Sequence, residues 1–183
     1  VTTGQLSDEI PNLFVPTGFT FAIWGLIYAL LLGYVVFVQG EAFGKSPSGA
    51  WSATDGWLFS VNAVLNAAWI VAWHWRQIAL SLVIMIALLL TLLALMERLQ
   101  MARSQAGAAG KARLFFLRQP ILVYLGWICV ATIANVTALL VTIGWEGFGL
   151  SPVAWTVVVI AVGGSVGLAL ALLRRAAASG FVV

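Results

Sequence analysis

The chain of 183 residues is 62% hydrophobic and only 8% charged, whereas a soluble domain carries about 45–50% apolar and about 25% charged residues. This composition excludes a soluble domain, and a net charge of +3 spread over the connections between apolar segments is too small for a basic stripe that binds nucleic acid. The single cysteine, Cys129, excludes a disulfide or a Cys-based metal site within the chain.

Five apolar segments are each long enough to cross a bilayer core, which takes about 20 helical residues. Their interiors carry no charge, so they predict an all-α membrane protein with one bundle of five transmembrane helices over residues 17–175. Residues 1–16 precede this bundle as a loop, and residues 176–183 follow it as a tail. In chain order, the predicted spans are Thr17–Gln39, Trp57–Trp75, Ile78–Met96, Pro120–Ile143 and Pro152–Leu173.

Prolines and short connections indicate how these spans begin and turn. Pro16, Pro120 and Pro152 stand where a helix start tolerates a missing N–H. Only Arg76 and Gln77 separate the second span from the third, so these two helices are expected to form a tight antiparallel hairpin. The stretch of residues 102–113, rich in Ala, Gly and basic residues, indicates a flexible linker that approaches anionic lipid head groups.

Basic residues fall unequally on the two sides of the predicted bundle, and the side that is richer in Lys and Arg is normally cytoplasmic. This rule predicts that the 97–119 loop and the C-terminal tail are cytoplasmic and that residues 1–16 lie on the outer face. Arg76 is the one basic residue on the outer side; the cytoplasmic side holds Lys45, Arg98, Arg103, Lys111, Arg113, Arg118, Arg174 and Arg175.

Ionisable side chains at membrane depth usually mark transport or catalysis, and the predicted spans contain none in their interiors. Acidic residues lie in loops or at span ends, so no catalytic set is predicted. His74 stands between Trp73 and Trp75 without a second ligand in view, which favours an interfacial anchor over a metal or haem ligand. We therefore expect neither an enzyme nor a metal site.

Aromatic and amide side chains form stripes at helical spacing on three spans. Buried amides inside a bilayer need partners, so these stripes should face protein rather than lipid. Two interpretations stay open, which are hydrogen-bonded packing between helices and an aromatic pocket for a flat apolar ligand. The stripes are Phe21, Trp24 and Tyr28; Asn62, Asn66, Trp69 and Trp73; and Tyr124, Trp127, Ala131 and Asn135.

The tryptophans divide by their depth. Counting 1.5 Å per residue from the predicted span ends puts Trp24 and Trp69, with two asparagines, about 9–14 Å below the outer surface and Trp127 about 24 Å below it. Trp127 is therefore not expected to share one compact site with the others. Five more should sit in the interfacial belt, namely Trp57, Trp73, Trp75, Trp145 and Trp155.

The last span carries a surface of small residues formed by Gly163, Gly164 and Gly167. Such a surface lets another helix approach closely. Its partner is either a helix of the same chain or another subunit.

Three blocks of these residues resemble the TspO/MBR family of tryptophan-rich sensory, translocator-protein-like membrane proteins. Phe14-x-Pro16 followed by Trp24-x-x-Ile27-Tyr28 is similar to the start of that family's second helix. Asn66-x-x-Trp69 with Trp73 and then Ala79-Leu80 is similar to its third helix and the start of its fourth. The block Pro120-x-x-x-Tyr124-x-x-Trp127-x-x-x-Ala131-x-x-x-Asn135 is similar to its fifth.

This resemblance covers residues 11–140. It implies that the family's first helix precedes Val1 and that Pro152–Leu173 is an additional C-terminal helix. The sequence departs from the family where Pro16-Thr17-Gly18-Phe19 replaces a double proline and a loop tryptophan, and where the family's Pro-Tyr dipeptide is split. These departures are typical of a divergent branch.

The resemblance implies a bacterial inner-membrane protein that binds a porphyrin, haem or another tetrapyrrole pigment inside the bundle, with a sensory, regulatory or transport role. The alternative is a structural or accessory subunit of a larger, pigment-bearing membrane complex such as a photosynthetic one. A homodimer is a further possible assembly. The implied ligand-binding residues are Trp24, Tyr28, Asn66, Trp69, Trp127 and Asn135, beneath an entrance loop with Phe14, Pro16 and Phe19.

Overall fold

The structure, a computed structural model, describes residues 2–10, 13, 18–43, 52–105 and 108–173. These residues form six α-helices and two short 3-10 helices, η1 (Gly18–Ala22) and η2 (Gly147–Gly149), and contain no strand. Five of the helices are long and apolar enough to cross a membrane, as predicted. The helices are α1 (Thr3–Asp8), α2 (Ile23–Phe43), α3 (Ala53–His74), α4 (Ile78–Gln105), α5 (Ala108–Thr142) and α6 (Pro152–Leu173).

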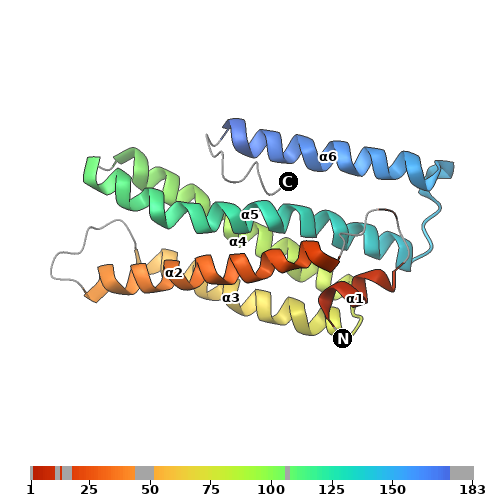
Figure 1. The fold of residues 1–183 in the computed structure, drawn as a ribbon, viewed down its shortest axis with the longest axis horizontal. Coiled ribbons are helices and arrows are strands. Elements are labelled where there is room, and N and C mark those ends of the chain that lie inside the picture. The colour runs from red at the N-terminus through yellow and green to blue at the C-terminus, as the bar shows by residue number, and fades with distance from the viewer. Residues whose placement is uncertain (1, 11–12, 14–17, 44–51, 106–107, 174–183) are drawn as a thin grey trace.

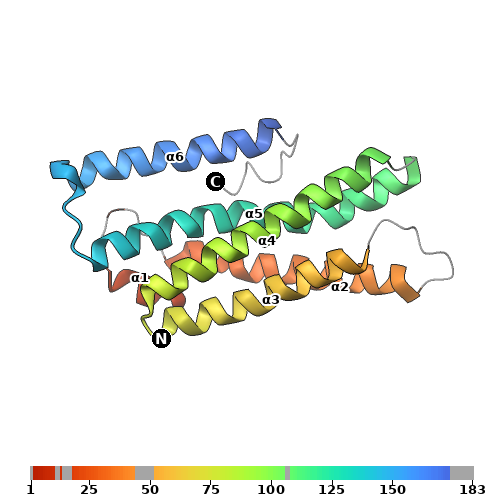
Figure 2. The same ribbon diagram turned by 180° about the vertical axis from the view of Figure 1, so that it is seen from behind.

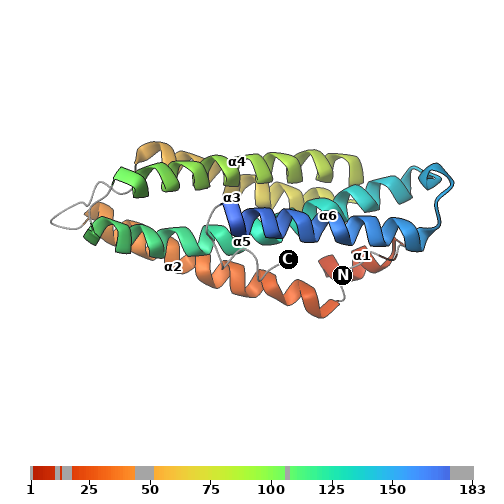
Figure 3. The ribbon, with the colours of Figure 1, turned by 90° about the horizontal axis from the view of Figure 1, so that it is seen from above.

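The long helices run side by side along the long axis of the molecule (Figure 1). α4 packs against both α3 and α5, and α2 packs against α5. α6 lies along the α5 side of the bundle (Figure 2). Seen from that side, α6 passes over α5 with α4 on one flank and α2 on the other (Figure 3). The core lies between α4 and α5, where fully buried side chains include Met85, Leu88, Leu92, Leu95, Ile121, Leu122 and Leu125.

The predicted hairpin between the second and third spans is confirmed, since α3 and α4 pack together along their length. Arg76 closes the turn in the left-handed conformation with φ of 56°. The N–H of Gln77 donates to the carbonyl of Ala72 at 2.9 Å, and the N–H of Arg76 donates to that of Trp73 at 3.0 Å. These bonds satisfy carbonyls that a helix end otherwise leaves free.

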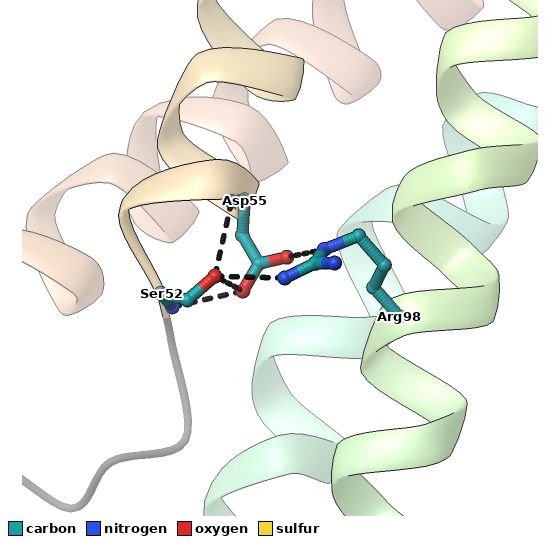
Figure 4. Close-up of polar contacts among 3 residues, drawn as sticks. All are labelled: Ser52, Asp55 and Arg98. Atoms are coloured by element: carbon teal, nitrogen blue, oxygen red, sulfur yellow. Dashed lines mark hydrogen bonds and ion pairs between the residues drawn. The ribbon is translucent and has the colours of Figure 1, made fainter.

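At the other end of the bundle, an ion pair joins α3 to α4 (Figure 4). The Ser52 N–H donates to the Asp55 carboxylate at 2.8 Å and the Asp55 N–H donates to Ser52 Oγ at 3.3 Å, which is a capping box. Arg98 Nε donates to Asp55 Oδ1, and Arg98 Nη2 donates to Ser52 Oγ at 2.9 Å. Because the Asp55 side chain is only 8% exposed, this contact fixes the helix pair at a point where the membrane-spanning part of α3 begins.

Two predictions about helix limits are wrong. The stretch of residues 102–113 is not a linker, because α4 continues to Gln105 and α5 begins at Ala108; alanine is the strongest helix former and outweighs the glycines. Pro120 does not start a helix but lies buried inside α5. Neighbouring helices in a membrane bundle compensate for the hydrogen bond that an interior proline removes.

The N-terminal segment, expected to be a loop, contains helix α1. Thr2 and Gln5 form a reciprocal capping box at its start, with Thr2 N–H donating to Gln5 Oε1 at 2.7 Å. Leu6 is buried and belongs to the hydrophobic core. The capping box and the buried leucine both stabilise this short helix against the bundle.

The glycine surface of α6 is divided between two environments. Gly163 and Gly167 are buried, whereas Gly164 is exposed. A Cβ atom at Gly163 would lie 3.5 Å from Ile133 Cδ1 on α5, and one at Gly164 would meet nothing within 4 Å. Gly163 therefore serves packing within the chain, and Gly164 faces away from it.

Candidate ligand site

Trp24 on α2 lies at the centre of an aromatic cluster. Its ring stacks on those of Tyr28 and Trp69, with centroids 5.5 and 5.7 Å apart and planes within 28° of parallel. It also meets Trp127 and Tyr124 edge to face, with centroids 6.0 and 6.1 Å apart. Both geometries are favoured by the quadrupoles of aromatic rings. The cluster thus joins α2, α3 and α5 through one side chain.

The expected depth of Trp127 is wrong, because its ring contacts Trp24 and also meets Phe21 edge to face at 6.2 Å. Figure 1 shows the reason: the C-terminal end of α5 extends well past the start of α2. The helix ends do not share one plane, so counting residues inward from each end overestimates the depth of a residue on α5. Trp24, Trp69 and Trp127 belong to one cluster.

Trp73, near the end of its span and on the stripe with Asn66 and Trp69, is buried, with 4% of its surface exposed. Its ring stacks on Trp69 with centroids 6.0 Å apart, and its Nε1 donates to the Thr3 carbonyl on α1 at 3.2 Å. Trp57 and Trp75, by contrast, are 72% and 73% exposed. Its burial agrees with its predicted place on the stripe, one helical turn after Trp69.

Asn66 links the three helices by hydrogen bonds. Tyr28 Oη on α2 donates to Asn66 Oδ1 at 3.0 Å, and Asn66 Nδ2 donates to Tyr124 Oη on α5 at 2.8 Å. Asn66 and Tyr124 are both buried. Both ends of the amide are therefore satisfied by side chains of the neighbouring helices.

Asn135 on α5 holds a second polar junction. Its Oδ1 accepts from Ser81 Oγ on α4 at 2.9 Å and from Trp69 Nε1 at 3.4 Å, while its Nδ2 donates to the Ala131 carbonyl at 3.0 Å. Asn62 is used in the same way, since its Nδ2 donates to Thr91 Oγ1 on α4 at 2.7 Å. The packing interpretation of the amide stripes accounts for these contacts. The role of Ser81 in this junction could not be predicted, because a single serine near the start of a helix forms no recurring sequence pattern.

A small cavity of about 20 Å³ remains between the cluster and α1. Trp127 lines it, and the Trp127 side chain is buried while its Nε1 has no hydrogen-bond acceptor among the described residues. A buried donor without a partner is rare in proteins and asks for an explanation. The cavity walls are Thr3, Ser7, Phe21, Trp24, Trp69, Trp73, Trp127, Ala131, Ala134 and Asn135.

Helix α1 covers this cavity and is held by few contacts. It packs against α3 and η1. Its contacts include the buried Leu6 and Ser7, the bond from Trp73 to Thr3, and, just beyond its end, Ile10 packed against the core and an ion pair between Glu9 and Arg76. The side chains of that ion pair are 48% and 69% exposed, so it contributes little. The cover is the weakly attached wall of the site.

Other parts of the implied site lie outside the described residues. These are Phe14, Pro16 and the side chain of Phe19, whose backbone belongs to η1. Within the described residues, no three His, Cys, Asp or Glu side chains lie together where they would hold a metal ion. His74 is exposed, and its Nδ1 lies 2.8 Å from the Ile70 carbonyl.

Comparison with known proteins gives one match. A family model described as TSPO-like protein matches residues 1–183. The match includes α6, which lies beyond the resemblance seen over residues 11–140. No curated protein and no solved structure matches the chain.

Proposed function

Because this chain belongs to the family of TSPO-like proteins, we propose that it binds a flat hydrophobic ligand in the aromatic cavity beneath α1. The ligand class is a porphyrin, haem or another tetrapyrrole, and the role is sensory, regulatory or in transport. The observation that supports this proposal most is the buried Trp127 Nε1, which has no acceptor among the described residues and belongs to a side chain lining that cavity. A carboxylate or carbonyl at the edge of the ligand would supply the acceptor, and the indole faces would stack on the macrocycle.

Binding of such a ligand requires the cavity to enlarge. A pocket for a drug-sized molecule measures about 300–1,000 Å³, and the cavity here measures about 20 Å³. The enlargement proposed is a displacement of α1, because α1 contributes two of the cavity walls, Thr3 and Ser7, and is attached by few contacts. Displacement of α1 breaks neither the hydrogen bonds of Asn66, which join α3 to α2 and α5, nor those of Asn135, which join α5 to α3 and α4.

The test is a titration of protoporphyrin, and separately of haem, into the purified protein in detergent, followed by the absorption band of the ligand rather than by tryptophan fluorescence. Trp127→Phe keeps an aromatic ring but removes the Nε1 donor, and it should weaken binding about threefold to tenfold. Trp24→Leu should weaken it further because the stacking surface is lost. Trp57→Phe is the control, since Trp57 is 72% exposed and distant from the cluster.

Two results would count against this site. One is the absence of saturable binding to the wild-type protein. The other is a titration of Trp127→Phe and Trp24→Leu that matches that of Trp57→Phe. The hydrogen bonds around Asn66 and Asn135 would then serve packing alone.

The second candidate function is that of an accessory subunit in a larger membrane complex, or of a homodimer. It is favoured by Gly164, a small residue on the exposed face of α6 with open space around it, where another helix could approach closely. Gly164→Leu adds bulk to the exposed face, while Gly163→Leu disturbs packing against Ile133 inside the chain. Gentle detergent extraction should show co-migration with other chains that Gly164→Leu abolishes; a wild-type monomer would exclude this function.

The proposed location is a bacterial cytoplasmic membrane with residues 97–119, which form the end of α4 and the start of α5 rather than the predicted loop, on the cytoplasmic side. Support comes from the fold, in which the junction of α4 and α5 lies at the end of the bundle opposite the turn that holds Arg76 (Figure 1). In a Cys129→Ala background, Gln100→Cys should react with a membrane-impermeant maleimide only after permeabilisation, and Phe148→Cys should react in intact cells. The reverse pattern would invert the topology.

A further inference from the structure

A second cavity, of about 690 Å³, lies between α5 and α6 next to their connection. It shares no lining residue with the aromatic cavity beneath α1. Its walls include Leu140 and Val141 on α5 and Val159 on α6, at the ends of two helices that are able to span a membrane. Gly163 brings α6 close to α5 further along, so the two helices enclose the apolar space at one end only. An apolar space at this level of a membrane is suited to a lipid chain.

Aromatic contacts and a hydrogen bond hold the residues at the mouth of this cavity in place. Trp145 packs on Trp155 and on Phe148, with ring centroids 4.9 and 5.2 Å apart. Trp155 Nε1 donates to the Gly147 carbonyl at 2.6 Å. Gly147 has φ of 65°, and a Cβ atom there would lie 2.7 Å from Trp155 Nε1, so no other residue fits without displacement. Tryptophans with this arrangement sit at the level of lipid head groups.

A carboxylate stands at the same mouth. Glu146 lines the cavity, is exposed, and forms no ion pair with any described residue. An unpaired carboxylate beside an apolar cavity complements an amphipathic molecule that carries a cation at its polar end. It repels an anionic head group, and it forms stronger bonds with an ammonium that carries N–H donors than with a quaternary ammonium that has none.

We propose that this cavity binds one phospholipid with a primary ammonium head group, phosphatidylethanolamine in chemical class, with an acyl chain between α5 and α6 and the ammonium on Glu146. The lipid fills the space that the bundle leaves between these two helices. The site is distinct from the proposed ligand site beneath α1: α5 contributes to both, but the two sites share no side chain.

The test is native mass spectrometry of the purified protein after incubation with phosphatidylethanolamine, phosphatidylcholine or phosphatidylglycerol at equal mole fractions. The wild-type protein should retain one phosphatidylethanolamine per chain, about twofold to fivefold in preference to phosphatidylcholine, as one exposed charge-assisted hydrogen bond provides. Glu146→Gln should still retain lipid but without this preference. Because Glu146 is exposed, this substitution is not expected to disturb folding.

A second pair of variants tests the cavity itself. Val159→Trp fills it and should reduce retention of every lipid, whereas Val157→Trp changes a side chain that is 61% exposed on α6 and should leave retention unchanged. Equal retention of the three lipids by the wild-type protein would overturn the proposal, as would an undiminished preference in Glu146→Gln. A lipid-free dimer would also overturn it, because a second copy would then cover the cavity.

Discussion

The ion pair between Asp55 and Arg98 offers the sharpest test of the packing of α3 on α4 (Figure 4). Arg98→Met keeps an unbranched apolar stem but removes the donors to Asp55 and Ser52. The Asp55 carboxylate, with its side chain 8% exposed, keeps its bonds from the Ser52 N–H and Oγ and is not left without donors. The cost should therefore fall below the about 3–5 kcal/mol that breaking a fully buried pair carries.

We expect Arg98→Met to lower the free energy of unfolding by about 1–2 kcal/mol, because the Arg98 side chain is 36% exposed and solvent screens the pair in part. Asp55→Ala should cost about 2–3 kcal/mol, since it also removes a capping box worth about 1 kcal/mol. In the double variant the two losses should overlap, which gives a coupling energy of about 1 kcal/mol.

The assay is reversible unfolding in mixed micelles of a mild detergent and dodecyl sulfate, followed by circular dichroism. Arg76→Met is the matched control, because the ion pair of Arg76 with Glu9 is 69% and 48% exposed and should be worth less than about 1 kcal/mol. A loss in Arg98→Met no larger than that in Arg76→Met would refute the reasoning. Additive losses in the double variant would refute it as well.

Three further substitutions test other contacts by the same unfolding assay. Gly147→Ala should lower the free energy of unfolding by about 2–4 kcal/mol, because it strains the backbone and clashes with Trp155. Gly149→Ala, at φ of 78° but with open space around it, should lower it by only about 1–2 kcal/mol. Equal losses would show that the clash is absent. Asn135→Leu removes the acceptor of the buried Trp69 Nε1, while Ser81 Oγ keeps the Ile78 carbonyl as acceptor. The loss should be about 1–3 kcal/mol, and a neutral effect would contradict the polar junction. Arg76→Gly should be about 1 kcal/mol more stable than Arg76→Ala, because both lose the ion pair and only alanine strains the left-handed turn; equal stability would indicate that the turn rearranges.

The main features of the fold follow from uninterrupted apolar length, which decides the number of spans, and from the two-residue connection at Arg76 and Gln77, which forces α3 beside α4. The stripes also identify the side chains that meet, because spacing of three and four residues puts Trp24, Tyr28 and Asn66 on faces that need partners. Such patterns are local to one helix. They indicate which face is buried but not which helix it meets.

The features that could not be predicted from the sequence depend on how the helices are placed relative to one another. The depth of Trp127 was misjudged because the ends of α2 and α5 are staggered, and no residue pattern reports such a stagger. Helix α1, which covers the cavity, could not be predicted because it has only six residues and a polar composition. Its one signal was the capping box of Thr2 and Gln5, which is easily overlooked beside long apolar runs.

In the proposed function, helix α1 and the aromatic rings around Trp24 make opposing contributions to the free energy of ligand binding. Displacing α1 exposes Leu6, at a cost of about 1.5–3 kcal/mol, and breaks the bond from Trp73 to Thr3, at about 1 kcal/mol. A free-energy cost of about 2.5–4 kcal/mol leaves roughly one molecule in a hundred to one in a thousand open, and the apparent affinity of any ligand falls by the same factor. The stacked rings around Trp24 must offset this cost through contact with the ligand. Loosening α1 without altering a ring should therefore strengthen binding, which separates the role of the cover from that of the aromatic cluster.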